Sequence, residues 1–594
     1  MRTDAATAKG PDLLFGHPRG LYVLFFTELW ERFSFYGMRA LLLLYMVNYF
    51  FWTQEQASVL IGWYAFLAYA LPLFGGLIAD KWLGARRAVV VGGVLLSAGH
   101  ILMAFEPKPF FFTALALIVL GVGFLKPNIS TQVGALYPPG DHRRDGAFTI
   151  FYMGINVGAF LGPLVCDWLR AHYGYHFGFA AAGVGMILGL IVYVIGQRKL
   201  IEFNQEAPAR PGEAAGGHPP HVVRDRIIVL LVVFAFVILF WMAFEQAANV
   251  MVVWADKHTN LRLFSLEPPP VTLDPAGAAP AAGGLSNVTI GPGQTQSINP
   301  FFIITIAGLF AFLWSFLDKR GLQPSTPTKM VFGLVGVAGA FAVMVPAARF
   351  ENRSALVTLA ALPEGLNLQE YGATRLSYDE QAGALQMSGV LTDLDRIRLL
   401  AATAPPAFRD AVENLSAKVK AGSRAESTLS NVPPDFAIAG EEAPLVFEWD
   451  AARSTLAAKG KVNERAKMEL LAAGAQPVFK QAVDELYLIT SRYRVSVWWL
   501  VLHYLLATMG ELCLSPVGLS LVTKLAPPRF VGMFMGGWFL ATAAAEKLAH
   551  VFGGMWGTMT PTRYFLIFVV VCSAGALLLA LLVPALKRRM HGVY

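Results

Sequence analysis

Long apolar blocks separated by short polar segments dominate the chain. A helix needs about 20 apolar residues to cross the hydrocarbon core of a bilayer. We therefore predict an all-α membrane protein with twelve spans, lying approximately at residues 20–49, 55–80, 87–105, 110–136, 146–168, 176–197, 226–255, 299–317, 328–348, 495–522, 530–553 and 564–586.

Composition and charge support a membrane protein rather than one that binds nucleic acid. Of 594 residues, 55% are hydrophobic and 15% charged, with a mean hydropathy of +0.52 and a formal net charge of +7. The basic residues concentrate in alternate segments between spans, as with Arg86 and Arg87 after the second span and Arg143 and Arg144 after the fourth. This is the positive-inside pattern, which predicts that both termini are cytoplasmic. No apolar stretch of signal-peptide type precedes the first span.

Nothing in the sequence indicates a metal site or catalysis. The three cysteines, Cys166, Cys513 and Cys572, fall within predicted spans and form no CxxC or Cys/His grouping, so we expect packing roles. HExxH, GxSxG and P-loop motifs are absent from the sequence. We expect no enzyme activity, no metal and no cofactor.

The spans divide six and six around the Pro/Gly/Ala-rich stretch "EAPARPGEAAGGHPPH". The turns after spans 2 and 8 match, with Asp80 and Asp318 each followed by glycine and basic residues, and such related halves are typical of transporters. The first turn, from Gly76 to Arg87, resembles the loop signature of the major facilitator superfamily. The predicted units are an N-terminal six-helix bundle (1–200), a cytoplasmic linker (201–225), the first part of the C-terminal bundle (226–348), and its remainder with a cytoplasmic tail (495–594).

Two insertions interrupt the second half. Residues 258–298 are expected to be irregular, whereas residues 349–494, called the insert below, carry an internal repeat that aligns 376–415 with 447–486 without a gap. Each copy predicts two short strands, a helix capped by Thr392 or Asn463, and a second helix. We therefore expect two tandem soluble α+β lobes on the exterior or periplasmic side. Three roles remain open for the insert: a purely structural role, capture of substrate, and contact with a partner protein.

The first span contains charges that are expensive in a membrane, in the stretch "ELWERFSFYGMRA". Each charge at the centre of a membrane helix costs about 2.5–3.5 kcal/mol on insertion scales. Successive helical residues turn by about 100°, so Glu28, Glu31, Arg32 and Arg39 share one face. Ion pairs with a purely structural role would explain these charges. However, further ionisable residues occur within other predicted spans, and ionisable residues inside a membrane indicate function by default. These are Lys126, Glu245 and Glu511.

Several motifs resemble those of the proton-dependent oligopeptide transporters within the major facilitator superfamily. "ELWER" is similar to the ExxER motif, and "FYMGINVG" (residues 151–158) matches the signature of span 5. "FLKPN", "FWMAFEQ" and "GELCLSPVGLS" match too. The resemblance covers all twelve spans but not the insert. It implies proton-coupled symport of di- and tripeptides into the cytoplasm by alternating access.

The resemblance also implies roles for individual residues. The proton-coupling group comprises Glu28, Glu31, Arg32 and Glu245. The gate pairs are Arg39 with Glu245 and Lys126 with Glu511. The substrate-binding residues are Arg32, Arg39 and Lys126 for a peptide carboxylate, Glu511 for the ammonium group, Asn156 for the peptide backbone, and Tyr36, Tyr69, Trp538 and Phe539 as pocket lining.

This chain departs from the family pattern at two positions. Phe35 replaces a usual tyrosine, and Gly62 aligns with the histidine of animal members, so proton binding is expected to rest chiefly on Glu31 and Glu245. His503 suits a packed core histidine better than a proton relay. The expected partners are peptides, protons and lipid, for a monomer in the bacterial inner membrane, with a periplasmic partner for the insert as a further hypothesis. Nitrate transport and a receptor or enzyme built on the insert are the alternatives.

Overall fold

The structure is a computed structural model. It describes residues 13–592 except 106, 139–140, 142, 201–218, 265–287, 369–374, 419–423, 429–440, 443–444, 451–452, 460–462 and 528–530. Most of the predicted linker and the centre of the predicted irregular segment 258–298 therefore lie outside the described residues.

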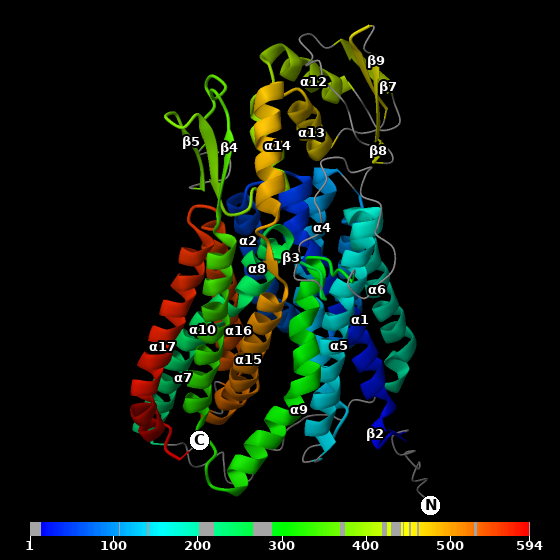
Figure 1. Cartoon of the computed structure of the whole chain (residues 1–594). Coiled ribbons are helices and arrows are strands. Elements are labelled where there is room, and N and C mark those ends of the chain that lie inside the picture. The colour runs from blue at the N-terminus through cyan, green and yellow to red at the C-terminus, as the bar shows by residue number, and fades with distance from the viewer. Residues whose placement is uncertain are drawn as a thin grey trace, which may run out of the picture.

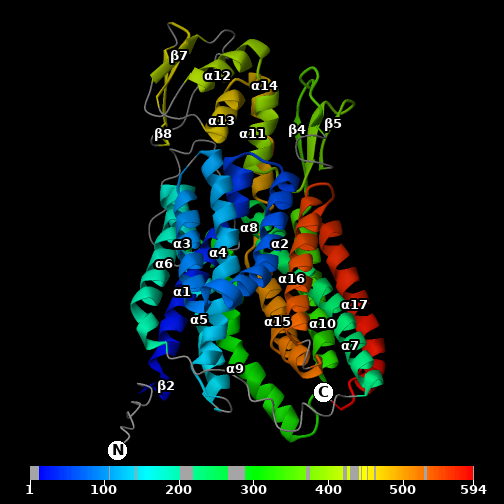
Figure 2. The ribbon, with the colours of Figure 1, turned by 180° about the vertical axis from the view of Figure 1, so that it is seen from behind.

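Two groups of long helices stand side by side, one from each half of the sequence (Figures 1 and 2). Each group has its own hydrophobic cluster. The first group contains α1 (Arg19–Leu44), α2 (Gln54–Ile78), α3 (Ala85–Leu102), α4 (Lys108–Ala135), α5 (Arg143–Tyr173) and α6 (Tyr175–Gly196). The second contains α7 (Pro220–Phe244), α8 (Val250–His258), α9 (Ile298–Lys319), α10 (Thr326–Glu351), α15 (Trp498–Leu525), α16 (Val531–Gly554) and α17 (Pro561–Arg589).

Most of these helices are suited to a bilayer by length and composition. Among the described residues, nine helical segments are long and apolar enough to cross a membrane. Helix α1 is outside that set and carries Glu28, Glu31, Arg32 and Arg39. The groups meet where α2 packs on α16 and α5 packs on α9.

The seventh predicted span, 226–255, lies within one apolar helical segment, Pro220–His258, that is interrupted at Glu245. A short 3-10 turn, Glu245–Ala248, separates α7 from α8. Side chains from other helices satisfy the polar groups at the break: Gln296 donates to the Ala247 carbonyl at 2.6 Å, and Tyr564 donates to Gln246 at 2.8 Å. Such internal partners are required where backbone is freed at membrane depth. The break contains neither proline nor glycine, so the sequence pattern does not reveal it.

Helices α1 and α5 approach closely because glycines of α5 face α1. A Cβ placed on Gly158 would lie against the Leu29 carbonyl oxygen, closer than real Cβ contacts allow, and 2.9 Å from the Arg32 Cβ. The close packing of α1 on α5 therefore depends on the missing side chain at Gly158.

We expect Gly158→Ala to push α1 away from α5 and destabilise the fold. Overpacking of this kind typically costs about 1–3 kcal/mol. The measurement is the Tm of the purified protein, with Gly308→Ala as the matched control, because a Cβ at Gly308 on α9 meets nothing within 4 Å. Equal Tm values for the two variants would contradict this packing.

Between α10 and α15 the insert forms the strands and helices that the repeat predicts. The first copy has β4 (Ser354–Thr358), β5 (Leu376–Asp379), β6 (Ala384–Ser388), α11 (Asp393–Ala402) and α12 (Pro406–Lys418). The second has β7 (Arg424–Thr428), β8 (Glu441–Glu442), β9 (Leu445–Asp450), β10 (Thr455–Lys459), α13 (Glu464–Ala473) and α14 (Pro477–Ser491).

Both copies share their local structure. The side chains of Thr392 and Asn463 accept from the backbone N–H groups of Asp395 and Ala466, and so cap α11 and α13. The sheets run β4-β6-β5 and β7-β10-β9-β8, so β4 and β7 add a third strand to the repeat. Two short pairings lie elsewhere, β1 (Leu13–Leu14) with β2 (His17–Pro18) and β3 (Thr259–Asn260) with β11 (Val495–Ser496).

The helices of the two copies share one core instead of forming separate lobes. Helix α11 packs on α13 and α14, and α12 packs on α13. Phe408 of the first copy and Phe479 of the second are both buried in the same hydrophobic cluster. Two short amphipathic helices cannot cover their own apolar stripes, so each pair uses the other as its partner. The expectation of two lobes is therefore corrected.

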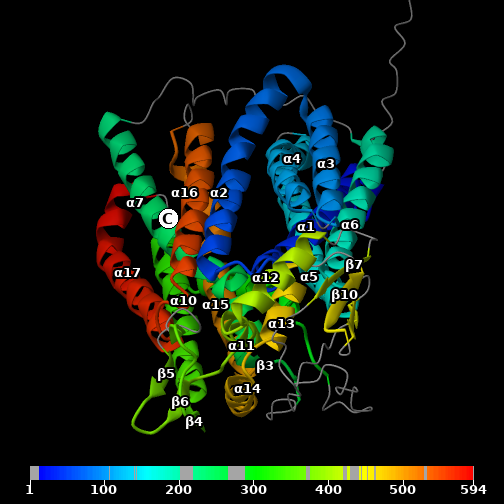
Figure 3. The same cartoon turned by 90° about the horizontal axis from the view of Figure 1, so that it is seen from above.

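The insert contacts both helix groups, and Figure 3 shows it lying over one end of them. Glu351, at the end of α10, is fully buried and accepts from Arg375 and from the Val390 N–H of the insert, at 3.1 and 2.9 Å. On the other side, Arg398 of α11 donates to the carbonyls of Phe51 and Trp52, at 2.7 and 3.1 Å. The insert thus joins the second group to the segment that follows α1.

Candidate functional site

The charged face of α1 lies in the interior. Glu28, Glu31, Arg32 and Arg39 are all buried, as the helical spacing predicts. The Arg32 Nε donates to Glu28 Oε1 at 2.9 Å and lies 2.5 Å from Glu31 Oε2. We call these three residues the Arg32 cluster. Two buried carboxylates on one guanidinium leave one excess negative charge when both are ionised.

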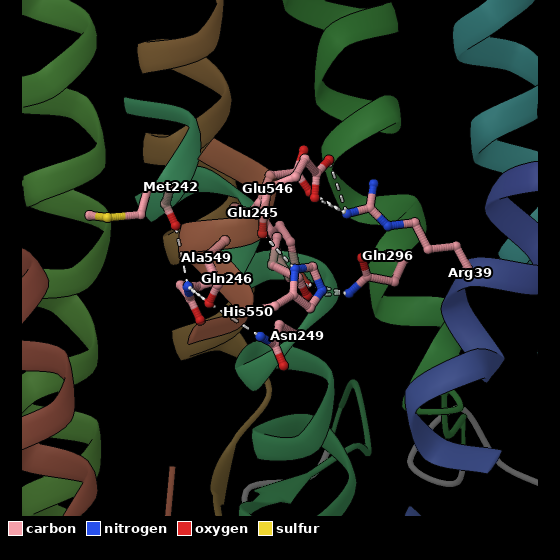
Figure 4. A network of polar contacts seen from close by, with 11 residues as sticks. Arg39, Met242, Glu245, Gln246, Asn249, Gln296, Glu546, Ala549 and His550 are labelled. Carbon is pink, nitrogen blue, oxygen red and sulfur yellow. Dashed lines mark hydrogen bonds and ion pairs between the residues drawn. The ribbon is translucent and has the colours of Figure 1, made fainter. Parts of the chain in front are cut away.

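A second cluster forms seven residues further along α1, a rise of about 10 Å. The Arg39 Nη2 lies 2.5 Å from Glu245 Oε2 and 3.2 Å from Glu546 Oε2 (Figure 4). Glu245 begins the turn that breaks the seventh span, and Glu546 lies on α16. These three residues, the Arg39 cluster, join the two helix groups. They repeat the two-to-one ratio of carboxylates to guanidinium.

Lys126 and Glu511, expected as a gate pair, have different partners in this structure. The Lys126 Nζ lies 4.3 Å from the centre of the Tyr69 ring, a cation–π contact. Glu511 is buried and accepts from Asn299 of α9 at 2.9 Å. Within the described part of the chain, the structure brings Arg39 and Glu245 together but does not join Lys126 to Glu511.

The remaining predicted residues occupy different surroundings. Tyr36 packs edge-on against Phe35, and the Asn156 side chain donates to the Tyr152 carbonyl of its own helix at 2.9 Å. Trp538 is buried against Phe234. Phe539, the next residue of α16, is 40% exposed, so the two neighbours face different surroundings.

Glu546 is the principal site residue that the sequence reasoning missed. It is fully buried in the apolar stretch "ATAAAEKLAH", and so meets the same criterion that singled out Glu245 and Glu511. In the sequence, the adjacent Lys547 suggests that Glu546 and Lys547 neutralise each other near the end of a helix. In the structure, the Lys547 Nζ instead lies 4.1 Å from the Trp63 ring centre. The predicted packing of His503 is confirmed, because this residue lies against Phe341 and contacts the Ala340 carbonyl at 3.0 Å.

Comparison with known proteins gives the family. The profile of the POT family matches residues 86–209 and 467–562. A di-/tripeptide transporter from Lactococcus lactis subsp. cremoris is 32% identical over 400 residues, which are 56% of this chain and 75% of that protein. The chain belongs to the POT family. The peptide transporter YePEPT from Yersinia enterocolitica, also similar, is 28% identical across 100% of this chain and 98% of its own length.

Solved POT structures share the fold. A mutant of peptide transporter POT in complex with alafosfalin superposes with a TM-score of 0.63 at 28% identity, covering 97% of this chain and 96% of that one. A structure of peptide transporter POT in complex with sulfate gives a TM-score of 0.63 at 27% identity, covering 98% of this chain and 97% of that one. The chain is therefore a member of a family of integral membrane transporters, with a mostly helical fold.

Proposed function

We propose that this POT family member is a secondary active transporter that carries di- and tripeptides into the cytoplasm together with protons. The observation that supports this most directly is the separation of buried charge. Lys126 and, once Glu31 is protonated, Arg32 provide a positive pole, whereas Glu511 provides a carboxylate held by an amide instead of a cation. A short peptide is a zwitterion, so its carboxylate complements the positive pole and its ammonium group complements Glu511. Recognition through the two ends allows many different peptide side chains.

The Arg32 cluster supplies a means of proton coupling. In this structure the Arg32 guanidinium is shared by Glu28 and Glu31. Protonation of Glu31 removes one of the two charges that hold Arg32, which then becomes available to a peptide carboxylate. Proton binding and peptide binding would therefore favour each other, as symport requires.

The gate pairs support alternating access. Arg39 and Glu245 connect the two helix groups at 2.5 Å, whereas Lys126 and Glu511 are not paired among the described residues. We propose that the structure represents the state closed at the Arg39 gate, and that exchange between the two pairs accompanies rocking of the halves.

The membrane arrangement completes the proposal. The twelve predicted spans cross the bacterial inner membrane with both termini in the cytoplasm, and the insert is a soluble α+β unit on the periplasmic side. The protein works as a monomer, without a cofactor and without enzyme activity. The Arg39 gate then lies toward the periplasm, since the insert contacts Phe51 and Trp52 just after α1.

Competition in proteoliposomes tests the substrate class. We expect unlabelled di- and tripeptides to compete with labelled dialanine for counterflow exchange, because they carry both charged ends at a suitable spacing. Nitrate should not compete, because it has no ammonium group to meet Glu511. Strong competition by nitrate together with weak competition by peptides would contradict the peptide proposal.

Removal of the insert tests whether transport resides in the helices. Residues 354–494 would be replaced by a short Gly/Ser linker that joins α10 to α15. We expect dialanine counterflow to persist, because all the charged residues of the proposed site lie on the long helices or the turn after α7. Loss of counterflow in a variant that keeps the helical circular dichroism expected of the long helices alone, without α11 to α14, would show that the insert takes part in transport.

A further inference from the structure

We infer that Glu546 and Glu245 hold a second coupling proton on Arg39, so that Glu546 is a proton-coupling residue of this transporter. The inference rests on the proposed proton-coupled transport and adds a residue and a stoichiometry to it. It begins from the geometry of the Arg39 cluster, where one guanidinium nitrogen contacts both carboxylates.

The charges of this cluster are unequal and buried. Glu546 is fully buried, and Glu245 and Arg39 are each only 9% exposed. Within the cluster, two carboxylates and one guanidinium carry a net charge of minus one, because Lys126, which also acts on Glu546, is placed over the Tyr69 ring and not in the cluster. A buried excess charge of this kind favours proton binding. A proton shared by the two carboxylates makes the cluster neutral. Its departure leaves both carboxylates on Arg39 and strengthens the link between the two helix groups.

Two buried side chains beside the cluster have polar atoms without a hydrogen-bond partner in the described structure. They are the Tyr64 hydroxyl on α2 and the Nε2 of His550 on α16. The His550 Nδ1 contacts the Glu546 carbonyl at 2.8 Å, one helical turn away. Unsatisfied buried polar atoms require an explanation such as a catalytic role or an unresolved water. Here they place two buried polar groups close to the carboxylates that are inferred to share the proton.

The charged and titratable groups around Glu546 come from several helices. They are Arg39 on α1, Tyr64 and Tyr69 on α2, Lys126 on α4, Glu245 after α7, and Lys547 and His550 on α16. Tyr64 also interacts with the charges of Glu31 and Arg32. It therefore interacts electrostatically with both the Arg32 cluster and the Arg39 cluster.

Variants of Glu546 distinguish two roles for this residue. It either binds a coupling proton or serves only as a structural partner of Arg39. In reconstituted full-length protein, the reversal potential at a fixed pH difference gives the number of protons carried per dialanine. We expect Glu546→Gln to carry one proton fewer than the wild type, and Glu546→Asp to restore the wild-type number. Glu364→Gln, an exposed glutamate of the insert, is the control and should match the wild type. An unchanged number in Glu546→Gln would overturn the inference.

A peptide-free measurement keeps the inference testable if transport fails. Infrared difference spectra of the purified protein between high and low pH should contain a protonated-carboxyl band that Glu546→Gln removes or shifts and Glu364→Gln leaves unchanged. A Glu546→Gln spectrum identical to that of the wild type would contradict the inference. Absence of dialanine counterflow in the wild type would instead count against the proposed function.

Discussion

Replacement of Glu31 by glutamine is expected to reduce the accumulation of dialanine against its gradient severely. Glutamine keeps the shape of the side chain but cannot gain or lose the proton. In the structure Glu31 lies 2.5 Å from Arg32 and shares it with Glu28. Without the Glu31 charge, Arg32 is no longer released by protonation, so the proton gradient has no means of driving this step.

The Glu31→Gln variant should lose most of its coupling but keep exchange. We expect gradient-driven uptake to fall far below that of the wild type, with only the proton of the Arg39 cluster still coupled, while dialanine counterflow without a gradient continues. Glu364→Gln provides the matched control, because it removes one carboxylate from an exposed position. Accumulation by Glu31→Gln at the wild-type level would show that the coupling proton does not bind at Glu31.

Replacement of Glu511 by glutamine should have the largest effect on peptide affinity. The side chain is buried and is held by Asn299 at 2.9 Å, and an amide of the same shape leaves that position filled. Loss of one partner of a buried charge pair costs about 2–5 kcal/mol, which is roughly 30-fold or more in Kd. Titration calorimetry with dialanine measures this change.

A peptide without a charged amino terminus tests the assignment of Glu511. The wild type should prefer dialanine to N-acetyl-dialanine strongly, and Glu511→Gln should lose most of that preference. If Glu511→Gln retains both the affinity and the preference, the ammonium group is recognised elsewhere.

The sequence predicts much of the helical framework because each helix that crosses a bilayer needs about 20 consecutive apolar residues. Every predicted span overlaps a long helix of the structure. The charged face of α1 follows from helical periodicity alone, and the burial of Glu28, Glu31 and Arg32 agrees with it. The repeat in the insert also predicts the caps at Thr392 and Asn463.

Features that depend on contacts between distant segments were not predictable in the same way. The break after Phe244 is supported by Gln296 and Tyr564, which lie far from it in sequence. The shared core of the insert depends on which apolar stripes meet, and a repeat does not specify this. Glu546 was recognisable as a buried charge, but its pairing with Arg39 emerges only when α16 is placed against α1.

The most direct test of the central claim is uptake of labelled dialanine by proteoliposomes that contain the purified protein. With an inward proton gradient, we predict accumulation above the external concentration, which stops when a protonophore dissipates the gradient. Failure to accumulate dialanine in liposomes that maintain the gradient, or accumulation that is indifferent to the protonophore, would contradict proton-coupled peptide symport.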